Sequence, residues 1–148
     1  MITIKNEDNL NENISLVEMA IINPKMCKQL SIQVEVEQRD EGPVPHVHVY
    51  LDKTRNKKNC SFVRLDKSEY CTHHSDGKPL NRKQRKEFIQ LMKSPSNLFI
   101  PNNEGVPTPI NWYQNAVIIW CETYEDGDLS KFNCDNKGIP VMPDYSNL

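Results

Sequence analysis

The sequence predicts an α+β fold, in which a three-stranded antiparallel β-meander has about three helices packed against it, in a single domain spanning residues 1–148. Three observations support this prediction. Apolar and polar residues alternate along residues 31–66, as in half-buried antiparallel strands. Two later segments place apolar residues at helical spacing instead. With 148 residues, 37% of them hydrophobic and 26% charged, the chain is long enough to bury its own core.

The first predicted element is a short helix that begins at Ser15. Ser15 and Glu18 have the spacing of a capping box, in which each side chain accepts a hydrogen bond from a backbone N–H at the start of the helix. Pro24 limits this helix, because proline lacks the N–H that a helix interior requires and its ring clashes with the preceding turn.

The meander follows, and its strands are expected in the segments LSIQVEVEQ, HVHVYLD and CSFVRLD. The residues DEGPVP between the first two segments are typical of a turn. In the middle segment the valines point to one face, while His46, His48 and Tyr50 share the other. Because this second face is polar and aromatic, we expect it to lie outside the deep core.

A basic helix is predicted next, from Asn81 to the residue before Pro95. Asn81 can cap it, with Gln84 at the capping-box position, and apolar residues line one stripe. The segment NLFIPNNEGVPTP is then expected to be a connection without regular structure.

The last predicted helix begins at Thr108 and Pro109, since proline is favoured at the first helical position, and continues to Tyr124. It is the most apolar helix and is expected to pack across the sheet. The acidic segment 125–148 is loop-like and peripheral, and its apolar residues favour an ordered cover over a loose tail.

Charge is distributed unevenly along the chain. Residues 53–93 carry twelve lysines and arginines against four acids, whereas the flanking segments carry six against sixteen. The net charge of −2 hides this asymmetry. The uneven charge distribution predicts either a basic patch that meets an anionic partner, or a solvated helix face and a solvated loop.

The expected location is the cytoplasm. The first residues lack a basic stretch followed by an apolar one, so no secretory signal is predicted. The five cysteines are odd in number and contain no C-x-x-C pair, which favours reduced thiols. No apolar run approaches the roughly 18 residues of a membrane span, so no membrane association is expected.

His46 and His48 are the first candidates for a functional site. Residues i and i+2 of a strand share a face, so two imidazoles at this spacing can bind one metal ion. Zinc requires three or four ligands, and His73 and His74 are the nearest further histidines. No cofactor is expected, unless these four histidines hold a zinc or other divalent ion.

A second hypothesis is acid–base chemistry on a phosphodiester. His46 and His48 would serve as base and acid, because histidine titrates near neutral pH. Tyr50 or Arg64 would hold the phosphate, since a guanidinium binds it in a bidentate manner.

A third interpretation assigns His46, His48 and Tyr50 to packing, with cross-strand partners such as Phe62 and Arg64. Under the phosphodiester hypothesis, basic residues of the following loop would grip the nucleic-acid backbone as point charges. A binding protein would use the same loop together with the basic helix. These binding candidates are Arg55, Lys57, Lys58, Arg82, Lys83 and Lys86.

The segment DEGPVPHVHVY, followed by two strands and a basic helix, resembles a family of small bacterial proteins of unknown function marked by P-P-H-x-H-x-x-Y. Their genes often lie beside toxin–antitoxin or other mobile-element genes. The resemblance covers residues 31–93: Pro45, His46 and His48 match the motif, while Val44 replaces the first proline and Tyr50 is one place early. It implies an intracellular accessory role without an assigned activity.

We therefore expect a small binding or regulatory protein of phage, mobile-element or toxin–antitoxin type. Its partner would be nucleic acid or a protein with an anionic surface. The alternative is a histidine-dependent phosphodiesterase or nuclease, with or without a metal ion.

Overall fold

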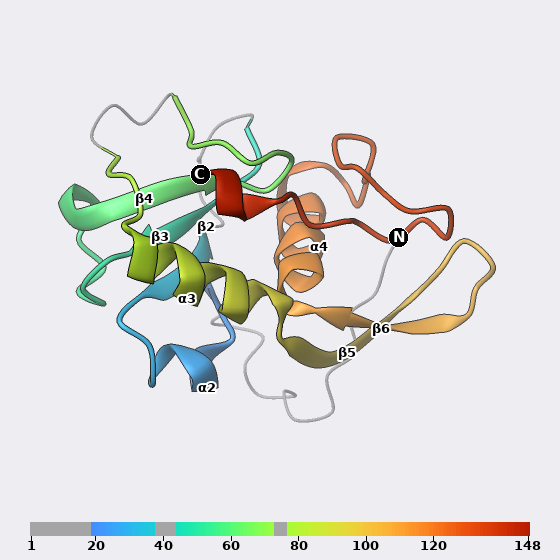
Figure 1. Ribbon diagram of the computed structural model, residues 1–148. Coiled ribbons are helices and arrows are strands. Elements are labelled where there is room, and N and C mark those ends of the chain that lie inside the picture. The colour runs from blue at the N-terminus through green and yellow to red at the C-terminus, as the bar shows by residue number, and fades with distance from the viewer. Residues whose placement is uncertain (1–18, 38–43, 73–76) are drawn as a thin grey trace.

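The computed structural model describes residues 19–37, 44–72 and 77–148, and contains two antiparallel sheets and three helices (Figure 1). The larger sheet has the order β1-β2-β3-β4, with every pair antiparallel. Its strands are β1 (Met19–Ile22), β2 (Gln33–Glu37), β3 (His46–Tyr50) and β4 (Cys60–Arg64). The α+β class is confirmed, and the predicted three-stranded meander corresponds to β2, β3 and β4.

The fourth strand, β1, corrects the predicted first helix. Ser15 and Glu18 lie outside the described residues, but Met19–Ile22 pairs with β2 as a strand. Asn23 then adopts a left-handed backbone with φ of 50°, which turns the chain into the short helix α2 (Pro24–Cys27). Pro24 therefore starts a helix instead of ending one, because the first helical position needs no N–H.

Helix α3 (Arg82–Lys93) forms as its sequence predicts. The Asn81 side chain accepts from the Gln84 N–H, and the Gln84 side chain accepts from the Asn81 N–H, both at 2.8 Å. This reciprocal pair satisfies backbone donors that have no partner inside the helix.

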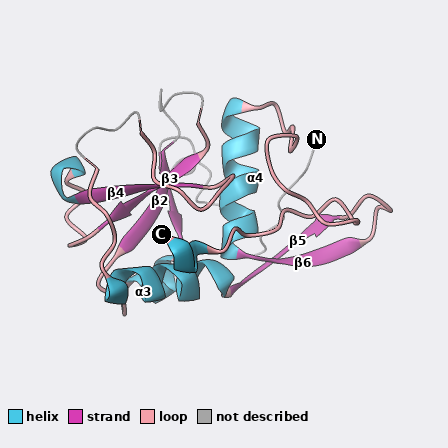
Figure 2. Ribbon diagram, turned by 45° about the horizontal axis from the view of Figure 1, so that its top comes forward, coloured by secondary structure: helices cyan, strands magenta, loops and turns pink. Residues whose placement is uncertain are grey.

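The predicted connection after α3 is instead a β-hairpin, formed by β5 (Pro95–Pro101) and β6 (Pro107–Asn111). Residues of β5 alternate strictly between exposed and buried. Proline can occupy these strands because a two-stranded sheet has two edges, where a missing N–H breaks no ladder. Figure 2 shows the hairpin projecting from the lower end of α4, away from the larger sheet.

Helix α4 (Trp112–Tyr124) begins after β6, and not at Thr108 and Pro109 as predicted. Asn111 caps it, with Gln114 completing a second capping box. The sequence NWYQ thus repeats the asparagine-to-glutamine spacing of the α3 start.

The main core lies between the valine face of the larger sheet, α3 and α4. Its largest side chains include Trp120 and Tyr113 of α4 and Phe88 of α3, all at most 1% exposed. The segment 125–148 contributes Tyr145, whose ring packs on Phe88 and whose hydroxyl donates to the Arg64 carbonyl. A smaller core joins the hairpin, α4 and Ile139. Within the described residues, no helix has the length and apolar character needed to span a membrane.

Candidate anion-binding surface

The predicted histidine face is buried, and this corrects the expectation that it lies outside the deep core. His46 is 1% exposed, His48 0% and Tyr50 1%. The two imidazoles stack with their centroids 5.3 Å apart, and His48 lies edge-on to Phe62 at 4.9 Å. The ring of His46 also lies 5.3 Å from that of Trp120.

Hydrogen bonds orient both histidine rings. The His46 Nδ1 lies 2.7 Å from the Val44 carbonyl oxygen, so this nitrogen carries the proton and donates it. The His48 Nδ1 lies 3.2 Å from the Tyr50 hydroxyl. Burial raises the pKa of Tyr50 well above its ordinary value, so its hydroxyl stays protonated at neutral pH. Among the described residues, the two imidazole rings are surrounded by packed side chains.

Arg64 is not available in the way the phosphodiesterase hypothesis expects. Its guanidinium makes a bidentate pair with Asp66, with Nε–Oδ1 at 2.9 Å and Nη2–Oδ2 at 2.7 Å. The hydrogen bonds to Asp66 raise the pKa of Arg64 further. A phosphate would have to displace the Asp66 carboxylate.

The metal hypothesis involves His73 and His74, which lie outside the described residues. Among the residues that the structure does describe, no group of three or more histidine, cysteine or acidic side chains is placed to hold a metal ion.

The predicted binding residues lie on one end of the molecule. The loop between β3 and β4 carries Lys53, Arg55, Lys57 and Lys58, all exposed. The segment after β4 folds back along it, and the Lys78 N–H donates to the Cys60 carbonyl at 2.9 Å. Helix α3 starts four residues after Lys78.

Two further contacts close this arrangement. The Lys53 ammonium lies 3.4 Å from the Lys28 carbonyl oxygen, which follows α2. Beyond Lys28, the Ser31 N–H and hydroxyl both donate to the Glu87 carboxylate of α3, and Lys83 pairs with the same carboxylate at 4.0 Å. The loop, the α2 segment and the first turns of α3 therefore surround the same end of the sheet, on the left in Figure 1.

We name this end the basic surface. Its members are Lys28, Lys53, Arg55, Lys57, Lys58, Lys78, Arg82, Lys83 and Lys86. The first turn of α3 contains no acid, so the positive end of its helix dipole adds to the same field. Across the described residues, Lys58, Lys78, Arg82 and Lys86 form no ion pair with a carboxylate.

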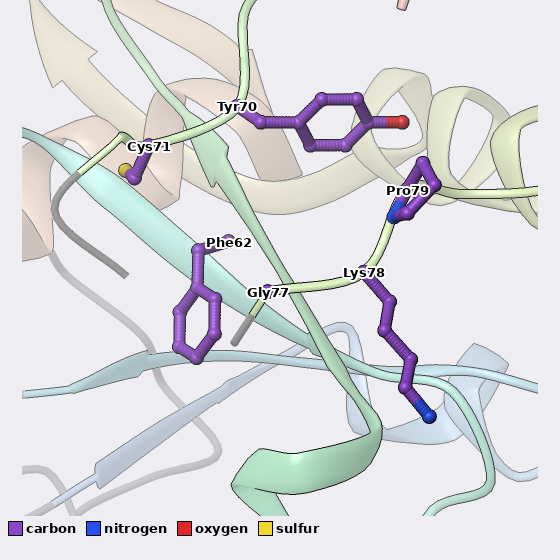
Figure 3. Close-up of a pocket in the computed structure, with 6 residues that line it drawn as sticks. All are labelled: Phe62, Tyr70, Cys71, Gly77, Lys78 and Pro79. Carbon is purple, nitrogen blue, oxygen red and sulfur yellow. The ribbon is translucent and has the colours of Figure 1, made fainter. Parts of the chain in front are cut away.

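A small cavity of about 120 Å³ adjoins the basic surface. It is lined by Phe62, Tyr70, Cys71, Gly77, Lys78 and Pro79 (Figure 3). In this view the Lys78 ammonium extends away from Phe62 and Cys71, and it lies 3.4 Å from the Asn59 side-chain oxygen. The ammonium therefore belongs to the outer basic surface, while the cavity wall is mainly aromatic and aliphatic.

Glu35 is the functional candidate that sequence reasoning missed. It is directly opposite His48 in the sheet and its side chain is 0% exposed. Its Oε1 pairs with Arg55 Nε at 3.3 Å and accepts from Gln33, whereas its Oε2 has no hydrogen-bond partner among the described residues. Burial raises the pKa of Glu35, and Arg55 offsets this only in part. Strand alternation was the available signal, because it places Glu35 and His48 on the same face.

The comparisons with known proteins leave the chain without an assigned relative. No protein-family model matches it, and neither a curated protein nor a solved structure is significantly similar.

Proposed function

We propose that this protein binds nucleic acid through the basic surface, as a small binding or regulatory protein of phage, mobile-element or toxin–antitoxin type. The observation that carries the proposal is the presence of basic side chains from separate segments at the same end of the sheet. The β3–β4 loop, Lys78 and the start of α3 are joined by the hydrogen bond from Lys78 to Cys60 and by chain continuity.

The charge around this surface favours a polyanion over a single small anion. The lysines and arginines are spread over a loop, an extended segment and a helix end, and they do not converge on one pocket. Such a spread suits the regular phosphates of a nucleic-acid backbone, each contacted by one flexible cation. The acids of this region are largely occupied: Asp52 accepts from Thr54, Glu87 from Ser31, and Glu35 is buried against Arg55.

The segment that follows α4 is acidic and lies on the right in Figure 1, across the molecule from the basic surface; its Glu125 pairs with Lys131 at 2.6 Å. Glu122 and Glu125 lie in and after the last turn of α4, and Asp126, Asp128 and Asp135 follow in the C-terminal segment. A charge separation of this kind orients the protein as it approaches a polyanion, so that the basic surface arrives first.

A salt titration tests the proposal. Binding of the full chain to a fluorescent DNA duplex and to single strands of DNA and RNA is measured by anisotropy as salt increases from about 50 to 200 mM. The affinity should fall linearly on a log–log plot, since each phosphate contact releases a counterion. Absence of binding to all probes at the lowest salt would overturn the proposal.

Single substitutions locate the contact surface. Lys58→Gln, Lys78→Gln and Arg82→Gln should each weaken binding and reduce the salt slope by about 1, as expected for the loss of one phosphate contact. Lys137→Gln is the matched control, because Lys137 is also exposed but lies beside the β5–β6 hairpin, where its carbonyl accepts from Asn103. An equal loss in the control would indicate non-specific charge attraction.

A histidine-dependent phosphodiesterase is the second candidate. It is favoured by one observation: Glu35, His48 and Tyr50 form a buried row of titratable side chains, and clusters with perturbed pKa values are common in active sites. The burial of both imidazoles disfavours it, because neither ring presents an edge to a substrate. We therefore expect binding without cleavage. Cleavage of the same probes that disappears in His48→Asn, with the fold retained, would favour the enzyme instead.

A further inference from the structure

The loop between β3 and β4 has an unusual backbone conformation that other contacts must stabilise. Lys53 and Arg55 adopt left-handed conformations, with φ of 65° and 58°, although neither is glycine. Side chains with a Cβ rarely populate this region, since the Cβ approaches the backbone too closely. A loop with two such residues keeps its shape only when contacts with the surrounding structure hold it.

Local hydrogen bonds provide part of this support. The Thr54 N–H and hydroxyl both donate to the Asp52 carboxylate, and the Lys58 N–H donates to the Asn56 side chain. The Asn59 N–H reaches the Asn56 carbonyl. These bonds remain within the loop, and they define its turns without fixing the loop to the body of the protein.

The ion pair between Arg55 and Glu35 provides a fixed anchor. Glu35 lies in the sheet with its side chain fully buried, and Gln33 holds the same carboxylate oxygen that faces Arg55. The Arg55 side chain is 53% exposed, so it spans from the surface of the loop to the buried carboxylate. Every other basic side chain of this loop extends from the same backbone that Arg55 anchors.

We propose that Glu35 is a positioning residue for nucleic-acid binding, which through Arg55 holds the β3–β4 loop so that Lys57 and Lys58 face the phosphates. The effect on nucleic-acid binding rests on the proposed function, whereas the anchoring of the loop rests on the ion pair alone. Arg55, which the sequence places among the phosphate contacts, becomes part of the anchor.

Electrostatics alone predicts the opposite effect for Glu35. A carboxylate beneath a basic surface repels a polyanion, so its removal should tighten binding if loop shape were irrelevant. Positioning predicts weaker binding, because the released loop must be ordered again on each association. The sign of the change in Glu35→Gln therefore separates the two explanations.

Hydrogen exchange tests the anchor without any ligand. Wild type, Glu35→Gln, Arg55→Gln and the double variant are compared at the amides of Thr54, Lys58 and Asn59. We expect both single variants to lose protection at these amides, and the double variant to lose no more than either, since both remove the same contact. Glu122→Gln is the surface control and should leave the protection of these amides unchanged. If Glu35→Gln also leaves their protection unchanged, the ion pair does not anchor the loop.

The binding assay then tests the consequence, with the same DNA and RNA probes. Glu35→Gln and Arg55→Gln should each weaken binding about three- to tenfold with an unchanged salt slope, since order is lost but no phosphate contact. Lys58→Gln should lower the slope by about 1. Tighter binding in Glu35→Gln, or a lower slope in Arg55→Gln, would overturn the positioning role and make Arg55 a direct contact.

The two proposals fail in different ways. If wild type binds none of the probes, the proposed function and the positioning role both fall, while the exchange data still establish or refute the anchor. If wild type binds but Glu35→Gln loses neither affinity nor loop protection, only the positioning role falls.

Discussion

Glu35 on β2 and His48 on β3 are direct cross-strand partners, and both side chains are 0% exposed. A carboxyl group is thus buried within a sheet face that also holds an imidazole and a phenol. Among the residues that the structure describes, the titratable groups that interact with it are Arg55, His48, Tyr50, Glu37 and, more weakly, Cys27.

This burial predicts a pH-dependent stability. Burial raises the pKa of Glu35, so the folded state retains a proton at pH values where the unfolded chain has released it. The free energy of unfolding contributed by Glu35 should therefore decrease as pH rises from the ordinary glutamate pKa through the raised one. Urea denaturation of wild type and Glu35→Gln across this range measures it.

The difference between the two proteins identifies the cause. Glu35→Gln, which has no such proton to lose, should remain more nearly constant over this range, and the two curves should diverge toward high pH. Glu122→Gln, at an exposed position of α4, is the control. Parallel curves for wild type and Glu35→Gln would contradict the prediction.

Because both histidines are buried, replacing either one should destabilise the folded protein. His46→Ala and His48→Ala should each lower the free energy of unfolding by about 2–4 kcal/mol, because each leaves a cavity among aromatic rings. An exposed catalytic pair would show little change. Denaturant midpoints measure the loss, and Gln90→Ala on the exposed side of α3, expected within about 0.5 kcal/mol of wild type, is the control.

The β5–β6 hairpin predicts opposite outcomes for adjacent residues. Ile100 is 1% exposed and packs with Ile110 and Ile118, whereas Phe99 is 52% exposed. Ile100→Ala should therefore cost about 2–4 kcal/mol, and Phe99→Ala less than about 0.5 kcal/mol. Thermal or urea unfolding checks both. A connection without strand alternation, as the sequence predicts for this segment, would give two similar values.

Thiol reactivity should follow burial. Burial raises the pKa of Cys121 to about 12, so only about one thiol in ten thousand is ionised at pH 8. Cys134 is half-buried, while Cys27, Cys60, Cys71 and Cys121 are buried. Iodoacetamide should modify Cys134 first in the native protein, and all five at comparable rates in denaturant. Mass spectrometry of timed samples measures the order, and early labelling of Cys121 would contradict it.

Three features could be predicted from the amino-acid sequence: the α+β class, the three strands of the meander and the capped helix α3. Each of these depends on a local signal. Strand alternation repeats every two residues, and the asparagine-to-glutamine box satisfies backbone donors within one turn, so neither requires knowledge of distant neighbours. The same capping box at Asn111 and Gln114 could also be identified in the sequence, but the proline at position 109 indicated an earlier start for helix α4.

Long-range packing sets three further features: which strand faces are buried, which residues surround Glu35, and which basic segments lie at the same end of the sheet. Alternation separates the valines from the histidines, but both faces of β3 are covered, and that depends on what the rest of the chain packs against each face. Likewise, Lys78 lies 18 positions after Cys60, and a backbone hydrogen bond between the two brings Lys78 beside the end of the loop that carries Lys58. Such contacts join groups that are far apart in the chain, and they depend on how the whole core packs.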